Sequence, residues 1–217
     1  MNFFEALIDG QRQEAIANRI FGVVIGIVTN NSDSEKLARV KVKFPWLTDD
    51  DESYWARIAT PMAGKQMGIY FLPEVDDEVL VIFEQGDVRF PYIIGGLWNG
   101  KDTPPLTNED GKNNVRLIKS RSGHLISLND EKGKETIEII DKSNNNKLVF
   151  DTSTNTITIQ TDKDIKLSAP KGTISLDAKE IEIHSSNRTN ITAKIGGMNI
   201  DSTPGTVDIK GSMINLN

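Results

Sequence analysis

The pattern of apolar and polar residues takes three successive forms along the chain. Over residues 1–19, apolar residues recur near helical spacing with polar residues between them, which predicts an amphipathic N-terminal helix. Over residues 20–100, short β-branched runs alternate with turn-forming residues. From residue 121 to the end, short apolar motifs recur between Ser, Thr, Asn, Asp, Lys and Gly. The pattern therefore predicts an almost entirely β protein with a helix at its start.

The middle region predicts a small barrel. Candidate strands cover residues 21–30, 37–44, 54–60, 78–84 and 91–97, and polar turn segments separate them. Five short strands within roughly 80 residues suggest a five-stranded Greek-key barrel of the oligonucleotide/oligosaccharide-binding (OB) type. Residues 101–120 are interpreted as a linker between this barrel and the region that follows.

The C-terminal region, 121–217, repeats an apolar-x-apolar motif, most regularly from about residue 155. The predicted core pairs are Ile157/Ile159, Ile165/Leu167, Ile174/Leu176, Ile181/Ile183, Met198/Ile200, Val207/Ile209 and Ile214/Leu216, with the weaker pair Ile191/Ala193 among them. Successive first members are 8, 9, 7, 10, 7, 9 and 7 residues apart. Each unit is thus one short strand and one turn.

A unit of this length buries two side chains on one face, which does not offset about 1–2 kcal/mol of backbone entropy for each ordered residue. Such units need neighbours, and the simplest arrangement is a three-sided needle with one side from each of three chains. All Phe, Tyr and Trp residues lie at or before Phe150, which suits a core too narrow for rings. A single-chain β-sandwich remains the alternative fold for this region.

Composition excludes several functions. The net charge is −6, and residues 1–110 carry 10 Lys and Arg against 18 Asp and Glu, so nucleic acid is not an expected partner. The chain has no cysteine and only two histidines, His124 and His184. We therefore expect no catalytic constellation, no metal site and no cofactor, and the acidic run from Asp49 to Glu52 is interpreted as solvated.

One set of residues resembles a known family, the phage baseplate assembly protein V and the equivalent domain of type VI secretion VgrG spikes. The resemblance rests on the run from Tyr54 to Ala59 and on Phe71-Leu72-Pro73-Glu74-Val75-Asp76-Asp77-Glu78-Val79-Leu80-Val81. The motif residues that we single out are Trp55, Arg57, Pro73, Glu74, Val75, Asp77, Glu78, Gly86, Pro91 and Gly95. Ser122-Gly123-His124 resembles the family's junction between barrel and needle. Asp76 departs from the pattern, because the family usually has glycine there.

The resemblance implies a non-enzymatic central spike of a contractile injection system. Its expected partners are two further copies of itself, a tail hub protein, a PAAR-like tip protein and, transiently, the target cell envelope. It would be made in the cytoplasm of the producing cell and reside in a virion or tail-like particle. No lysozyme-like insert separates barrel from needle, so wall hydrolysis is not carried over. A carbohydrate-binding module on a trimeric β-stalk is the alternative function.

Overall fold

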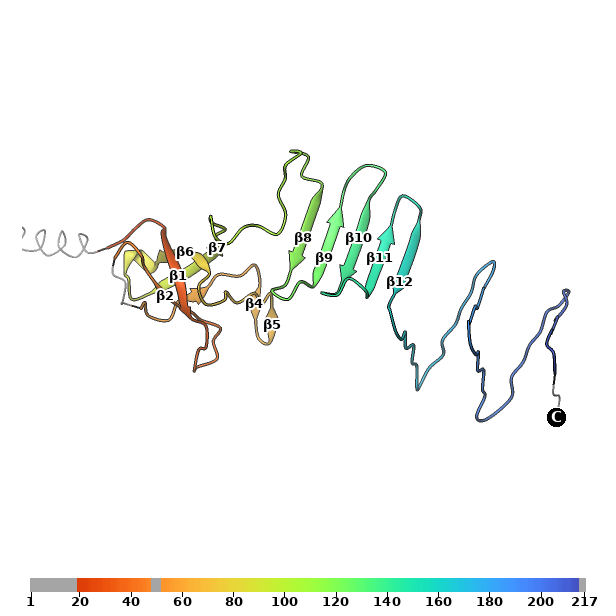
Figure 1. The fold of residues 1–217 in the computed structure, drawn as a ribbon. Coiled ribbons are helices and arrows are strands. Elements are labelled where there is room, and N and C mark those ends of the chain that lie inside the picture. The colour runs from red at the N-terminus through yellow and green to blue at the C-terminus, as the bar shows by residue number, and fades with distance from the viewer. Residues whose placement is uncertain (1–18, 48–51, 215–217) are drawn as a thin grey trace, which may run out of the picture. The chain divides into compact units, whose positions relative to one another are not determined.

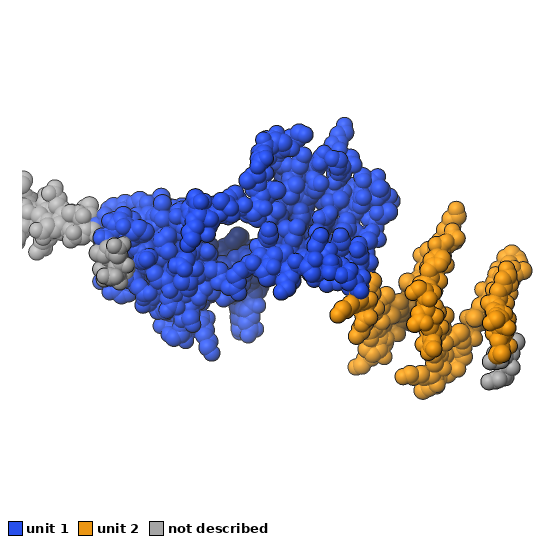
Figure 2. All heavy atoms as spheres, viewed as in Figure 1, with its two compact units in different colours: residues 1–162 blue, residues 163–217 orange. Residues whose placement is uncertain are grey.

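The computed structural model describes residues 19–47 and 52–214. Within these ranges the chain is β structure and loops apart from one 3-10 turn, η1 (Glu84–Gly86). The predicted N-terminal helix, residues Asp49 to Asp51 and Leu216 lie outside the described residues. The chain divides into two units, residues 1–162 and 163–217 (Figure 2).

The first unit begins with a five-stranded sheet (Figure 1). Its strands are β1 (Val24–Asn30), β2 (Lys41–Lys43), β3 (Arg57–Ile58), β6 (Glu78–Phe83) and β7 (Pro91–Gly96), in the order β2-β1-β6-β7-β3. The β3–β7 pair is parallel and the others are antiparallel. An antiparallel bridge between Val40, just before β2, and Ala56, just before β3, joins the two edge strands of the sheet. This connectivity is that of an OB barrel, as the sequence predicts.

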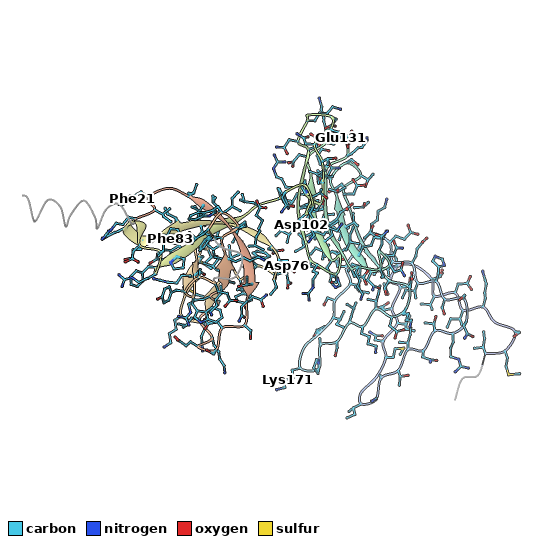
Figure 3. The ribbon with its side chains drawn as sticks, turned by 60° about the vertical axis from the view of Figure 1, so that its left-hand side comes forward. Phe21, Asp76, Phe83, Asp102, Glu131 and Lys171 are labelled. Atoms are coloured by element: carbon cyan, nitrogen blue, oxygen red, sulfur yellow. The ribbon has the colours of Figure 1, made fainter. Side chains whose placement is uncertain are left out.

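The barrel interior is small and aliphatic. Its most buried members are Val28, Val40, Val42, Ala56, Val79, Val81 and Ile93, each at most 1% exposed, with Phe44 and Phe83 beside them. Alternate residues of β6 are buried, because successive side chains of a strand point to opposite faces. Gly26 permits the close packing, since a Cβ there would lie 3.1 Å from Val81 and 3.2 Å from Val42. Figure 3 shows Phe83 within this barrel.

The turn before β6 explains the departure at Asp76. Asp76 adopts a φ of +76°, in the left-handed region that favours glycine. Three bonds hold the turn: the Asp76 N–H donates to the Val28 carbonyl at 2.9 Å, the Asp77 N–H to the Glu74 carbonyl at 3.2 Å, and the Glu74 N–H to Asp77 Oδ2 at 2.8 Å. Asp keeps the left-handed turn without glycine because its short polar side chain tolerates this conformation.

A second five-stranded sheet follows the barrel (Figure 1). It is an antiparallel meander of β8 (Val115–Lys119), β9 (Leu125–Asn129), β10 (Thr136–Ile140), β11 (Lys147–Asp151) and β12 (Thr156–Gln160). Strand β8 lies inside the range interpreted as linker, so that interpretation is corrected: the irregular segment ends before Val115. The reason is that Val115, Leu117 and Ile118 pair along β9.

The second unit contains no strand among its described residues, 163–214. Within these residues the Gly172 N–H donates to the Ala169 carbonyl at 3.1 Å. In Figure 2 the unit is a thin zigzag of atoms, and Figure 3 shows Lys171 at the tip of one of its loops. An extended chain of this kind leaves most of its backbone donors and acceptors without ladder partners from its own chain.

Candidate assembly surface

The candidate functional surface is one face of the β8–β12 sheet. Strand register places two rows of side chains across all five strands on this face. One row is Ile118, Ile126, Ile139, Leu148 and Ile159, and the other is Arg116, Leu128, Ile137, Phe150 and Ile157. We call the nine apolar members of these rows the apolar face. Eight of them are 37–67% exposed, with Leu148 partly buried.

The opposite face of the same sheet is mainly polar. One of its rows runs through Leu117, Ser127, Glu138, Val149 and Thr158. The sheet is therefore two-faced, with the strand periodicity of two separating apolar from polar side chains. A sheet that is apolar on one face and uncovered there is incomplete as a folded unit.

Arg116 is the exception in the rows and lies at their β8 end. Its guanidinium forms an ion pair with Asp130, in the loop after β9. Both side chains are more than half exposed, so the pair is worth at most about 1 kcal/mol. The charge therefore stands at the margin of the apolar face and does not interrupt its centre.

The residues predicted as needle core are exposed in one copy. Every predicted member that the structure describes is 49–69% exposed, and these members are Ile157, Ile159, Ile165, Leu167, Ile174, Leu176, Ile181, Ile183, Met198, Ile200, Val207, Ile209 and Ile214. A single chain thus does not bring them together as a core. The physical reason is that the described residues after β12, 161–214, pair with no strand of their own chain, so no second layer from these residues covers the side chains.

The exposure of these side chains argues against a single-chain β-sandwich for the repeats and leaves the three-chain needle as a prediction. A single-chain β-sandwich would bury the pairs against its own second sheet, and the described residues from 163 to 214 contain no strand that could do so. Burial of the same pairs between copies stays a prediction. Ile157 and Ile159, the first of these pairs, lie on the apolar face itself, since β12 pairs with β11 beside Phe150 and Leu148.

The sequence prediction omitted part of the apolar face. Ile137/Ile139 and Leu148/Phe150 carry the same apolar-x-apolar motif, and the pair Ile126/Leu128 precedes them. Their first members are 11 residues apart, against 7–10 in the later repeats, because the turns between these strands are longer. The motif itself could have revealed them if a variable spacing had been allowed.

The family-motif residues are distributed over the barrel and do not form one site. The Trp55 ring lies beneath two cations, the Arg39 guanidinium at 5.7 Å and the Lys41 ammonium at 5.6 Å from its centroid. The Arg57 guanidinium lies 5.5 Å from the centroid of the Tyr92 ring on the neighbouring strand. Contacts of this kind stabilise the barrel surface and provide no reactive group.

The remaining motif residues end strands or form turns. Glu78 Oε2 accepts from Asn99 Nδ2 at 3.0 Å, which ties the start of β6 to the chain after β7. Gly86 has φ +79° and ends the turn η1, and Pro91 is buried as the first residue of β7. Gly95 and Gly96 continue β7. Val75 is 47% exposed and lies in the turn that contains Asp76.

The strongest electrostatic arrangement lies in the loop between β1 and β2. The Asp33 carboxylate is 3% exposed and accepts from Arg39 Nε at 2.8 Å and from the N–H groups of Glu35 and Leu37. The Arg39 bond holds the pKa of Asp33 well below its usual range, with the two N–H donors assisting. Asp33 therefore acts as an ionised anchor for this loop, which is a structural role.

The two histidines and Glu52, the one described residue of the acidic run, form ordinary surface contacts. His124 Nδ1 accepts from the Lys142 N–H at 3.2 Å, and the His184 side chain is 85% exposed. Glu52 pairs with Lys41 at 2.9 Å, and this bond lowers the pKa of Glu52. Among the described residues no three His, Cys, Asp or Glu side chains gather as a metal site would require. No helix in the described ranges is long and apolar enough to cross a membrane.

The chain thus contains an OB barrel, a β meander with one apolar face and a segment of repeated apolar pairs. Comparison with known families identifies the barrel: residues 24–98 match the type VI secretion system/phage-baseplate injector OB domain. These residues belong to that domain family, and the chain is related to phage-baseplate and VgrG spike proteins.

Individual relatives agree with this assignment. The chain is 30% identical over 138 residues to the type VI secretion system spike protein VgrG1a of Pseudomonas aeruginosa, covering 58% of this chain and 22% of the relative. It is 31% identical over 126 residues to the spike protein VgrG3 of Vibrio cholerae, covering 54% and 12%. It is 29% identical over 135 residues to the actin cross-linking toxin VgrG1 of V. cholerae, covering 58% and 12%. The matches thus span less than a quarter of each relative.

Proposed function

We propose that this chain is the structural central spike of a contractile injection system and works as a homotrimer. The observation that carries the proposal is the exposed apolar face of the β8–β12 sheet, together with the exposed apolar pairs among residues 163–214. Three copies that turn these surfaces toward a common axis would give the chain the core that one copy lacks.

The energy of assembly follows from the exposure of these residues. Burying a large aliphatic side chain contributes about 1.5–3 kcal/mol, and roughly half of each side chain on the apolar face remains exposed in one copy. Each then contributes about 1 kcal/mol on assembly, or about 9 kcal/mol for the nine residues of one chain. This value lies within the range of about 5–15 kcal/mol that holds a native domain together, and it is an upper estimate.

Backbone hydrogen bonding supports the same arrangement for the repeats. Since residues 164–214 form no strand within one chain, their N–H and C=O groups need ladder partners from other copies. Three intertwined chains satisfy both requirements, because each supplies one side of a narrow prism and strands for its neighbours. We extend the needle over residues 121–217 on this basis.

The proposed role is mechanical. The barrels dock on a tail hub protein, the needle points toward the target envelope, and contraction drives it through. A separate PAAR-like tip protein caps the needle. The needle would be rigid because its strands run across the axis and stack along it, with about 4.8 Å between neighbouring strands. The proposed function includes no catalysis, and the toxin activity in one relative's name is attributed to that relative alone.

Light scattering on the purified full-length chain tests the proposal. A stable particle of three times the 24.1 kDa of one chain is expected. A well-folded monomer at micromolar concentration would refute the trimer, because the apolar face would then be stable in water. Zymography on peptidoglycan provides the complementary test, in which no lytic activity is expected.

A further inference from the structure

The outer side of the barrel sheet carries a strip of apolar side chains. The strip crosses the three central strands, β1, β6 and β7. Strand register places Ile25 of β1 opposite Leu80 of β6, and Ile82 of β6 opposite Tyr92 of β7. Ile94 occupies the irregularity in the β6–β7 register and is exposed. We call these five residues the outer barrel strip.

The strands beneath the strip have the sequence of strands that are covered on both faces. Residues 79–83 of β6 are all apolar, and residues 23–28 are apolar apart from Gly26. Strands buried on both faces have such continuous apolar runs, whereas a strand with one solvated face alternates apolar and polar residues. Among the described residues only the inner side chains of β6 are buried, and Ile25 and Ile94 are 45% and 43% exposed. The outer barrel strip therefore has no cover within the described ranges.

The strip differs from the other exposed apolar segment of the barrel. Strands β4 (Ala63–Gly64) and β5 (Met67–Gly68) form a hairpin that is a sheet of its own, and Tyr70 and Phe71 after it are exposed. Those residues follow one another along the chain, whereas the outer barrel strip spans three paired strands. One straight element, such as a helix, can therefore cover the strip.

The chain enters the barrel at one end of the strip. The Ile20 N–H donates to the Gly86 carbonyl at 2.9 Å, and Arg19 Nη1 donates to the Gln85 carbonyl at 2.9 Å. Both acceptors belong to η1, which directly follows β6. A Cβ on Gly86 would lie 2.9 Å from the Cβ of Arg19, so the entering chain is packed against η1. Residues 1–18 are thus attached close to the Ile82 end of the strip.

Residues 1–18 have the length and the apolar pattern that such a cover needs. A helix of 18 residues is about 27 Å long, and the six residues of β6 span about 20 Å. Charged or polar residues separate the apolar positions, so one side of the predicted helix would face water. The apolar positions that recur near helical spacing are Phe3, Phe4, Leu7, Ile8, Ala15 and Ile16.

We propose that residues 1–18 form a helix that packs its apolar side on the outer barrel strip of the same chain. The helix would be the missing layer of the barrel domain, because a sheet that is apolar on both faces needs an element against each. A contact within one chain requires no other copy, so this inference is independent of the proposed trimer. A second copy of the chain and a separate hub protein are the competing occupants of the strip.

Thiol labelling of the full-length chain tests the cover, because the chain contains no cysteine of its own. The probe variant is Ile94→Cys, and the control is Val75→Cys, at a position of similar exposure, 47%, in the turn before β6. Each is also prepared with Leu7→Asp/Ile8→Asp, which places charges on the predicted apolar side of the helix and leaves the barrel sequence unchanged. Labelling rates are measured in buffer and, for normalisation, in denaturant.

Ile94→Cys is expected to react at least about ten-fold more slowly than Val75→Cys, and to within about two-fold of it once Leu7→Asp/Ile8→Asp is added. Equal rates for the two positions without the added charges would overturn the proposal, because the strip would then be open. Protection that persists with the charges would overturn it as well, because another surface would cover the strip. Protection that appears only after a hub protein is added would assign the strip to the hub.

Crosslinking identifies the chain that supplies the helix. The variant Ile8→Cys/Ile94→Cys is treated with a short bismaleimide, and the products are separated under denaturing conditions and weighed by mass spectrometry. The expected product is a single chain of 24.1 kDa that carries one reagent molecule across both thiols. A product of doubled mass would assign the helix to a second copy, and the absence of any crosslink would remove the helix from the strip. Either result would overturn the proposal, whatever the mass of the native particle.

Discussion

The sharpest test of the apolar face compares two adjacent residues of β12. Ile159 belongs to the apolar face and Thr158 to the opposite face, and both lie on a strand that is exposed along its whole length in one copy. We therefore consider Ile159→Asp with Thr158→Asp as its matched control. In an isolated chain the two substitutions should have nearly equal effects on the free energy of unfolding, because substitutions at exposed positions usually change it by less than about 0.5 kcal/mol.

In the trimer the two substitutions differ greatly. Ile159 is 61% exposed, so assembly would bury the larger part of a side chain worth about 1.5–3 kcal/mol in full, or about 1–2 kcal/mol for each chain. A carboxylate there forfeits this contribution and adds a desolvation cost of several kcal/mol for each of three ions. The total exceeds about 10 kcal/mol for each trimer, which corresponds to more than seven powers of ten in the assembly constant.

Light scattering between about 1 and 50 μM checks the difference. Ile159→Asp is expected to give monomers or aggregates with the barrel still folded, and Thr158→Asp to give trimers. Circular dichroism controls for loss of the fold. Equal masses for the two variants, whether both trimeric or both monomeric, would contradict the assignment of Ile159 to a buried axis.

Three further predictions concern other parts of the chain. The double variant Ile174→Asp/Ile181→Asp should also abolish the trimer, and an unchanged mass would remove these pairs from the needle core. Asp76→Val should lower the free energy of unfolding of the barrel by about 1–2 kcal/mol while Asp76→Gly is tolerated, because φ is +76°; denaturant unfolding checks this. The hydrogen bond from Ser143 lowers the pKa of Asp141 to about 2. The folded pKa is thus below that of the unfolded chain, so this stabilisation is present above about pH 4 and is lost as the pH falls toward 2. Asp141→Asn should therefore show a flatter melting temperature between pH 4 and 2, and a slope equal to that of the wild type would refute this role.

Much of the barrel could be predicted from the chain. The five strands fall within the predicted ranges because their β-branched residues alternate over short runs, as in β6, where every second side chain is buried. The strand ends were less predictable: the predicted range 54–60 contains the two-residue strand Arg57–Ile58. There the parallel pairing with β7 determines where the strand begins and ends, and that pairing joins residues distant in sequence.

The sequence by itself determined the periodic apolar pairs, the barrel strands and the absence of aromatic residues after Phe150, because local patterns follow directly from residue order. Only the tertiary structure decided that the upstream pairs on β9 to β11 align with those of β12, so that Arg116 to Ile159 form two rows on one face. It also decided that the hairpin after β3 leaves Tyr70 and Phe71 exposed. The physical reason is that register and exposure depend on which strands pair across loops of different lengths, and residue order alone does not fix that pairing.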